Sequence, residues 1–228
     1  MSVPDSSGTD NPYRRQFEHI RKIWRRQEQG RHLYGIERWT LFALACFLTL
    51  MPAMVVKWFF ARFGLHARKV AIEVYAVSKP VLLLLLLACG SARAPWAFVV
   101  AAVFLIDLYS FLFGIILLRE FWSRPFSYSR SLIMLAFNFV EFNAAFAVFY
   151  TFLRCLTANG APVHGWSNVF YFTVATSSTV GFGDITPLPG IGRLLVTAQI
   201  LGSMGMMALL VASFVGKLDY QRTPVDAA

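Results

Sequence analysis

The string Thr176–Asp184, which reads TSSTVGFGD, is the part of the chain whose residue types and spacing could do chemistry. Glycine occupies positions 181 and 183, so every second residue near the end of the string lacks a side chain. Glycine enters backbone conformations that are closed to other residues, so successive carbonyl groups can turn toward one axis instead of alternating sides. The candidates for such a column of backbone oxygens are Thr179, Val180, Gly181 and Phe182.

Two apolar segments must position this string. One runs from Ser131 to about Leu156 and is interrupted by Glu141, and the other runs from about Leu194 to Gly216. Non-helical backbone at membrane depth is tolerated only where it is buried in protein or lines a water-filled path, because each unsatisfied polar group in hydrocarbon costs several kcal/mol. A glycine-containing string between two spanning helices therefore predicts a pore lining.

The residues just before the string predict a short helix. A short turret occupies positions 158–165, and an amphipathic run begins at Trp166. Ser167 is a suitable N-cap, and the helix is expected to end near Ser177, before the first glycine of the string. A phosphate-binding loop is disfavoured, because no Gly-Lys-Ser/Thr follows the glycines and no strand precedes them.

Composition and charge exclude a water-soluble globule. The 228 residues are 57% hydrophobic and 14% charged, whereas soluble proteins carry roughly 25% charged residues. The formal charge is +9, and eight of the 21 basic residues lie before Trp39, while long stretches after it carry almost none. This layout is typical of a membrane protein with a basic cytoplasmic flank and not of a nucleic-acid binder.

Three further apolar segments precede the linker that leads to Ser131. Trp39–Val56 is uncharged and long enough to span a membrane, but Pro52 interrupts it. Val70–Cys89 is weaker, because Glu73, Lys79 and Pro80 leave only its second half unbroken, a length that also fits a re-entrant or interfacial helix. Trp96–Leu118 is strong and holds one ionisable residue, Asp107, which is expected to face protein or water and to have a partner.

The string Thr176–Asp184 resembles the selectivity-filter signature of potassium channels. The order of outer helix, pore helix, filter and inner helix is similar to their pore domain over about 131–216, and Ile185-Thr186-Pro187 continues the resemblance. It implies that the backbone oxygens of Thr179 to Phe182, with the Thr179 hydroxyl at the inner end, replace the water around a potassium ion. It also implies four chains around one axis, since this chain has a single copy of the string.

Other roles follow from the same resemblance. Thr176, Gly183 and Asp184 are implied to support the filter, with Asp184 holding its outer end by hydrogen bonding and raising the local cation concentration. Phe182 stands where the commonest version of the family has Tyr, so one hydroxyl that ties the filter to the pore helices is missing. Gly202 or Gly205 is implied as a gating hinge, although glycine in a membrane helix also permits close packing.

The sequence thus predicts an all-α membrane protein with a pore domain of two transmembrane helices, a re-entrant pore helix and a filter, preceded by two to three further membrane segments. The expected function is passive, potassium-selective transport through a homotetramer. Potassium is the permeant ion, and no cofactor, catalytic residue or nucleic acid is expected. The alternatives are a weakly selective cation channel and a non-conducting membrane partner subunit. The expected location is a cell membrane, crossed several times, with a bacterial inner membrane as the first choice.

The expected domain organisation has five parts. It comprises a basic cytoplasmic N-terminal segment, N-terminal membrane segments, a cytoplasmic linker, the pore domain and a short C-terminal tail, at 1–38, 39–118, 119–130, 131–216 and 217–228. Within the first part, Phe17, Ile20 and Trp24 recur at helical spacing, which fits either a surface-lying amphipathic helix or a solvated basic helix.

Counting spans exposes a conflict in this organisation. If the filter loop enters from outside and all three early segments span, the eight basic residues before Trp39 lie outside, contrary to the positive-inside tendency. One early segment is therefore expected not to cross. Segment length points to Val70–Cys89 as the exception, and charge points to Trp39–Val56.

Overall fold

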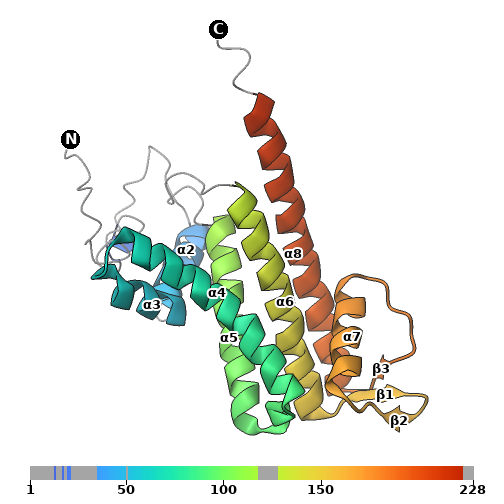
Figure 1. The fold of residues 1–228 in the computed structure, drawn as a ribbon. Helices are drawn as coiled ribbons and strands as arrows, with labels where there is room; N and C mark the ends of the chain where they lie inside the picture. Colours follow the sequence, from blue (N-terminus) through green and yellow to red (C-terminus); the bar gives the residue numbers. More distant parts are fainter. Residues whose placement is uncertain are drawn as a thin grey trace, which may run out of the picture. The chain divides into compact units, whose positions relative to one another are not determined.

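The computed structural model describes four single residues near the N-terminus and the ranges 35–49, 51–117 and 128–222; the four residues are Tyr13, Phe17, Ile20 and Arg21, all helical. The helix expected over 13–38 and the linker 119–130 therefore lie largely outside the described residues. The described part is mostly helical (Figure 1). Four of its helices are long and apolar enough to cross a membrane, which confirms the predicted all-α membrane fold.

The chain divides into two compact units, one of Met1–Ser78 with Ile106–Arg124 and one of Lys79–Leu105 with Pro125–Ala228. The division cuts through two long helices, α4 (Leu65–Ala88) and α5 (Pro95–Leu117), each of which contributes to both units. The 3₁₀ turn η1 (Ser91–Arg93) joins these helices within the second unit.

The first unit begins with two short helices where the sequence predicted one span. Helix α2 covers Gly35–Thr49, and α3 covers Pro52–Ala61 with the proline in its first turn. A proline lacks the N–H that would continue the preceding helix, but it fits the first turn of a new one. Neither helix reaches the roughly 20 residues that a span requires. Among the described residues, Trp39–Val56 is therefore divided between two helices, and it is one of the two segments that were expected as the one that does not cross.

Helix α4 is continuous, although the sequence suggested an interrupted segment. It passes through Pro80, and His66–Ala88 is one of the four candidate spans. Membrane helices tolerate proline where neighbouring groups satisfy the freed backbone. Between the two arguments on the early segments, the structure favours the charge argument, because α4 and α5 can span and α2 and α3 are too short.

The second unit contains the three helices of the expected pore domain. They are α6 (Tyr128–Leu153), α7 (Trp166–Ser177) and α8 (Ile191–Arg222). Helix α6 is central: it contacts α7, α8 and η1, and all ten residues of 141–150 are buried. Glu141 does not interrupt this helix, and α8 starts three residues earlier than expected and continues beyond Gly216. Figure 1 shows α6 and α8 side by side, with α7 and the strands at one end of them.

A small antiparallel sheet replaces part of the expected turret. Strands β1 (Leu156–Ala158), β2 (Ala161–Pro162) and β3 (Thr186–Pro187) lie in the order β2-β1-β3. The turn between β1 and β2 consists of Asn159 and Gly160, which both have positive φ, at 50° and 79°. Asn-Gly is the commonest two-residue hairpin turn, so this dipeptide was a readable signal. The hairpin holds the chain that leads from α6 into α7.

Helix α7 ends at Ser177, as predicted, but it does not begin as predicted. Its N-cap is Gly165, at φ 87° and ψ 132°, and no side chain caps the helix there. Ser167 already lies inside the helix. The Asn168 side-chain nitrogen instead donates to the carbonyl oxygen of His164 at 2.9 Å. The serine was misassigned because glycine reaches a backbone conformation that makes an earlier start possible.

Candidate functional site

The backbone of the string alternates in conformation. Thr179, Gly181 and Gly183 have positive φ, at 60°, 53° and 81°, whereas Val180 and Phe182 between them do not. Alternation of φ between the two signs lets successive carbonyl groups point to one side, which is the arrangement expected for a column of oxygens. Thr179 is β-branched and rarely adopts a positive φ. Such strain, on the order of 1–3 kcal/mol, persists where the surrounding structure imposes it and clusters at functional sites.

The end of α7 binds the N–H groups of the string. The N–H groups of Val180 and Gly181 both donate to the carbonyl oxygen of Ala175, at 3.0 and 3.2 Å, and that of Thr179 donates to the Thr176 carbonyl at 3.1 Å. These bonds satisfy the last carbonyl groups of the helix, which have no partner within it. They also place Thr176 at the junction between pore helix and string. The N–H groups of the string therefore face the helix end.

Tyr171 on α7 contacts the outer part of the string. Its ring stacks on that of Phe182, with centroids 6.1 Å apart and planes 13° from parallel. The pKa of its phenol is raised by removal from water and by the charge and hydrogen bond of the Asp184 carboxylate. A phenol and Asp184 thus meet beside the string, although Phe182 itself has no hydroxyl. Tyr171 was not predicted as a site residue, and its only signal in the sequence was an aromatic polar residue on the predicted helix.

The chain that leaves the string is fixed to the end of α6. Strand β3 pairs with β1, and the Leu188 N–H donates to the Cys155 carbonyl at 2.8 Å. At Gly192, near the start of α8, a Cβ atom would lie 2.9 Å from that same carbonyl oxygen. Glycine is required there because no larger residue fits against the backbone of Cys155. Both ends of the string are therefore held in place. Helix α7 holds the end before it, and the sheet together with α8 holds the end after it.

One fully buried amide connects the three helices of the pore region. The Gln199 side chain on α8 has no exposed surface. Its nitrogen donates to the Thr173 carbonyl at 2.7 Å and to the Ser177 hydroxyl at 2.8 Å, and its oxygen accepts from the Tyr150 hydroxyl at 2.9 Å. Gln199 was not predicted as a functional residue. Its signal was a single amide within the apolar segment from about Leu194 to Gly216, since such residues bond across membrane helices.

The two hinge candidates lie within an unbroken helix. Helix α8 runs through Gly202 and Gly205 without interruption. A Cβ atom built at Gly205 meets nothing within 4 Å. Close packing within the chain therefore does not require glycine at position 205.

The string is open on one side in the single chain. Val180 and Phe182 are 54% and 68% exposed, and Asp184 is also exposed. A cleft of about 380 Å³ lies between the string and α7. Its lining is mostly apolar and consists of Phe170, Tyr171, Val174, Ala175, Ser178, Val180 and Phe182. An exposed apolar cleft of this kind is typical of a surface that other chains cover.

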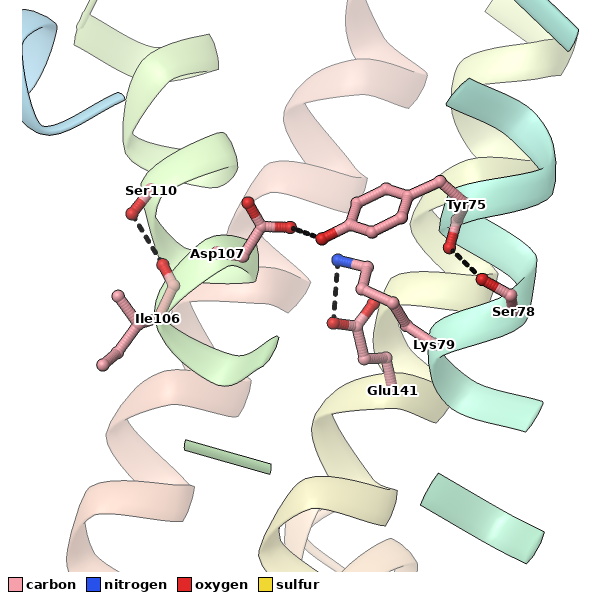
Figure 2. A network of polar contacts seen from close by, with 7 residues as sticks. All are labelled: Tyr75, Ser78, Lys79, Ile106, Asp107, Ser110 and Glu141. Carbon is pink, nitrogen blue, oxygen red and sulfur yellow. Dashed lines mark hydrogen bonds and ion pairs between the residues drawn. The ribbon is translucent and has the colours of Figure 1, made fainter. Parts of the chain in front are cut away.

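Asp107 and Glu141, two acidic residues of the apolar segments, both have partners (Figure 2), as was expected for Asp107. Within the second unit, Lys79 Nζ on α4 lies 2.9 Å from Glu141 Oε1 on α6, and the two side chains are 7% and 0% exposed. Within the first unit, the Tyr75 hydroxyl donates to Asp107 Oδ2 at 3.0 Å. Charged groups in a membrane are costly unless paired, so these contacts explain how α4, α5 and α6 accommodate Lys79, Asp107 and Glu141.

Comparison with known proteins finds ion channels. A family model described as "Ion channel" matches residues 137–219, from within α6 almost to the end of α8. This region is similar to ion channels. The voltage-gated potassium channel Kch of Escherichia coli (strain K12) is 29% identical over 98 residues, which are 42% of this chain. The match covers 23% of that relative's length. No solved structure shows a significant match.

These findings confirm the predicted resemblance to potassium channels and the prediction of a channel instead of an enzyme. They also confirm a membrane protein with several spans. The matched range begins and ends inside long helices and contains the whole of α7, the string and the sheet strand β3. The roles of single residues in the string and the subunit number stay predictions.

Proposed function

We propose that this ion channel conducts potassium selectively through a homotetrameric pore, in which Thr179, Val180, Gly181 and Phe182 of each chain coordinate the ion. The observation that carries the proposal is the alternation of φ along Thr179–Gly183. It allows successive carbonyl groups to face one side, while N–H groups of the string bond to the end of α7. Carbonyl oxygens in that arrangement replace the hydration shell of a potassium ion, and no covalent chemistry is involved.

The subunit number is supported by the open side of the string. One chain contributes one string and one apolar cleft, and both are exposed. Four copies around an axis would enclose the ion from all sides and cover the clefts. Thr176, Gly183 and Asp184 are proposed to support the filter, with Tyr171 as an additional contact of Asp184.

Voltage gating, which the name of the E. coli relative states for that protein, is not part of the proposal. A voltage sensor needs basic residues at about every third position of a membrane helix. None of the four candidate spans in the described part of the chain carries such a series. The proposed location is a bacterial inner membrane, and the proposed partners are potassium ions, lipid and three further copies of the chain.

Potassium flux into liposomes tests the proposal, with the natural chain compared with Gly181→Ala. Gly181 has φ 53°, and a Cβ atom there meets no other atom within 4 Å. The substitution therefore acts on backbone conformation, at a cost of about 1 kcal/mol or more per chain. We expect potassium flux to fall at least tenfold while the tetramer persists in gel filtration.

Bilayer recordings of the natural chain separate the alternatives. Sodium permeability comparable to that of potassium in the natural chain would favour a weakly selective cation channel. Silent recordings from a verified tetramer would favour a non-conducting partner subunit. Unchanged potassium flux in Gly181→Ala would contradict the proposed site.

A further inference from the structure

We propose that Gln199 is a positioning residue that sets the conformation of the filter by tying α8 to the last turn of α7. The proposal rests on the proposed function for the place of the filter, but its geometry stands independently. All three partners of the amide come from α6 and α7, and none comes from α8 itself. The side chain thus joins three helices through one rigid, planar group.

The orientation of the amide is fixed by its partners. The Thr173 carbonyl can only accept a hydrogen bond, so the group that faces it at 2.7 Å must be the amide nitrogen. The second N–H then reaches the Ser177 hydroxyl, and the amide oxygen is left for the Tyr150 hydroxyl. Both donors and the acceptor are therefore in use. Loss of one of these partners would leave a buried polar group without its hydrogen bond, which is destabilising.

The residues that bond to the amide are themselves buried and closely packed. Tyr150 is 1% exposed, and its ring packs edge-on against Phe172 with centroids 5.3 Å apart. Thr173 and Ser177 are 0% and 2% exposed. Because buried side chains in such packing have few alternative positions, a displacement of α8 must move the last turn of α7 or break these bonds.

The last turn of α7 is also the turn that holds the string. Ser177 is the last residue of α7, and the carbonyl oxygen of Ala175, two residues earlier, accepts the N–H groups of Val180 and Gly181. Gln199 therefore bonds to residues on both sides of Ala175 in the sequence, Thr173 and Ser177. We expect the amide to keep this turn in the conformation that imposes positive φ on Thr179 and Gly181. Through the same bonds, motion of the inner helix reaches the filter.

Hydrogen exchange measured by mass spectrometry on the purified full chain tests the positioning role directly. In Gln199→Leu, a peptide that contains Val180 and Gly181 should exchange about tenfold faster, as expected from the loss of one or two buried hydrogen bonds. A peptide from 141–150 of α6 should change much less. Equal acceleration in both peptides, or no change in the filter peptide, would overturn the proposal, because a merely structural residue loosens the whole unit.

Ser203→Ala is the matched control. Ser203 lies one turn later on α8 and is 1% exposed, but its hydroxyl donates to the Ile200 carbonyl of its own helix at 2.9 Å. Its removal also takes a buried polar group from α8 and should leave exchange of the filter peptide unchanged. An effect as large as that of Gln199→Leu would contradict the special role of the amide.

Tyr150→Phe is a second variant that tests the same proposal if Gln199→Leu fails to fold. The Tyr150 hydroxyl contacts the amide and not the string, so its loss can reach the filter only through Gln199. We expect the filter peptide to exchange about threefold faster than in the natural chain. This increase is smaller than that expected for Gln199→Leu, because the nitrogen of the amide keeps its partners. Exchange of the filter peptide equal to that of the natural chain would count against the proposal.

Recordings of ion selectivity separate this inference from the proposed function. If the natural chain prefers potassium, Gln199→Leu should lower the potassium-to-sodium permeability ratio severalfold, and Ser203→Ala should not. If the natural chain shows no potassium preference, the proposed function fails, and hydrogen exchange still decides whether Gln199 positions the string. A natural permeability ratio in Gln199→Leu would overturn the coupling to the filter.

Discussion

At the scale of single residues, the buried pair of Lys79 and Glu141 illustrates how a charge is accommodated in an apolar helix. Lys79 counted against a spanning α4 when the sequence was considered alone. Its partner lies 62 positions further along the chain, on α6. No local sequence pattern predicts such a pairing, because the pairing depends on which helices pack against each other. That Asp107 would have a partner was predictable, but the identity of the partners of Asp107 and Glu141 was not.

The ion pair leads to a prediction about stability. Lys79→Met leaves the Glu141 carboxylate buried beside an apolar side chain, which should destabilise the protein by about 3–5 kcal/mol. Replacement of both residues, as Lys79→Met with Glu141→Leu, removes the charges together and should recover most of that loss. Thermal unfolding in detergent measures both variants. Equal midpoints for the single and double variants would show that the pairing does not stabilise α4 against α6.

The residues of the string were the most predictable part of the site. Gly181 and Gly183 both have positive φ, a backbone conformation that favours glycine. The alternating glycines in the sequence therefore predicted the backbone conformation of the string correctly at these two positions. Tyr171 and Gln199 were not predictable in the same way. Each acts through a contact that only the packing of α7 against its neighbours creates.

At the scale of elements, prolines account for the main differences between sequence and structure. Pro52 begins a new helix, whereas Pro80 lies inside one. Both residues have the same local chemistry, and the outcome depends on whether neighbouring groups satisfy the backbone. The start of α5, by contrast, agrees with the predicted segment to within one residue, because Pro95 precedes its apolar run.

Substitution of two glycines of α8 by alanine is expected to have different effects on stability. Gly192→Ala would bring a Cβ atom to 2.9 Å from the Cys155 carbonyl, so α8 must shift away from the end of α6. We expect a loss of about 1–3 kcal/mol in unfolding free energy, typical of overpacking. A lower midpoint in thermal unfolding would be the measured sign.

Gly205→Ala is the matched comparison and also tests the hinge. It meets no atom within 4 Å and should hold or raise stability by up to about 1 kcal/mol, since alanine favours helix. If Gly205 is a gating hinge, the open probability in single-channel recordings should change while the unfolding midpoint does not. Unchanged gating would leave Gly202 as the remaining candidate.

At the scale of the whole molecule, the number of candidate spans removes the conflict over charge. Helices α4, α5, α6 and α8 can cross, and the short α2 and α3 precede them. If the filter loop enters from outside and these four helices cross, the start of α4 and the sequence before it would lie in the cytoplasm. The eight basic residues before Trp39 would then obey the positive-inside tendency.

This arrangement predicts the result of reporter fusions. A fusion at residue 64, between α3 and α4, should report a cytoplasmic position, because α2 and α3 are too short to span. A fusion at residue 90, between α4 and α5, should report the opposite side and serves as the control. An external position for residue 64 would mean that α2 and α3 together cross the membrane.

The hairpin turn at Asn159 and Gly160 has a practical consequence for the assembled channel. The turn is exposed, and β1 is held on its other edge by β3, which follows the filter. Extra residues inserted between 159 and 160 would therefore lengthen a free loop without changing the register of the strands. We therefore expect that an epitope or a fluorophore can be attached at this turn, close to the string, with the strand pairing left intact.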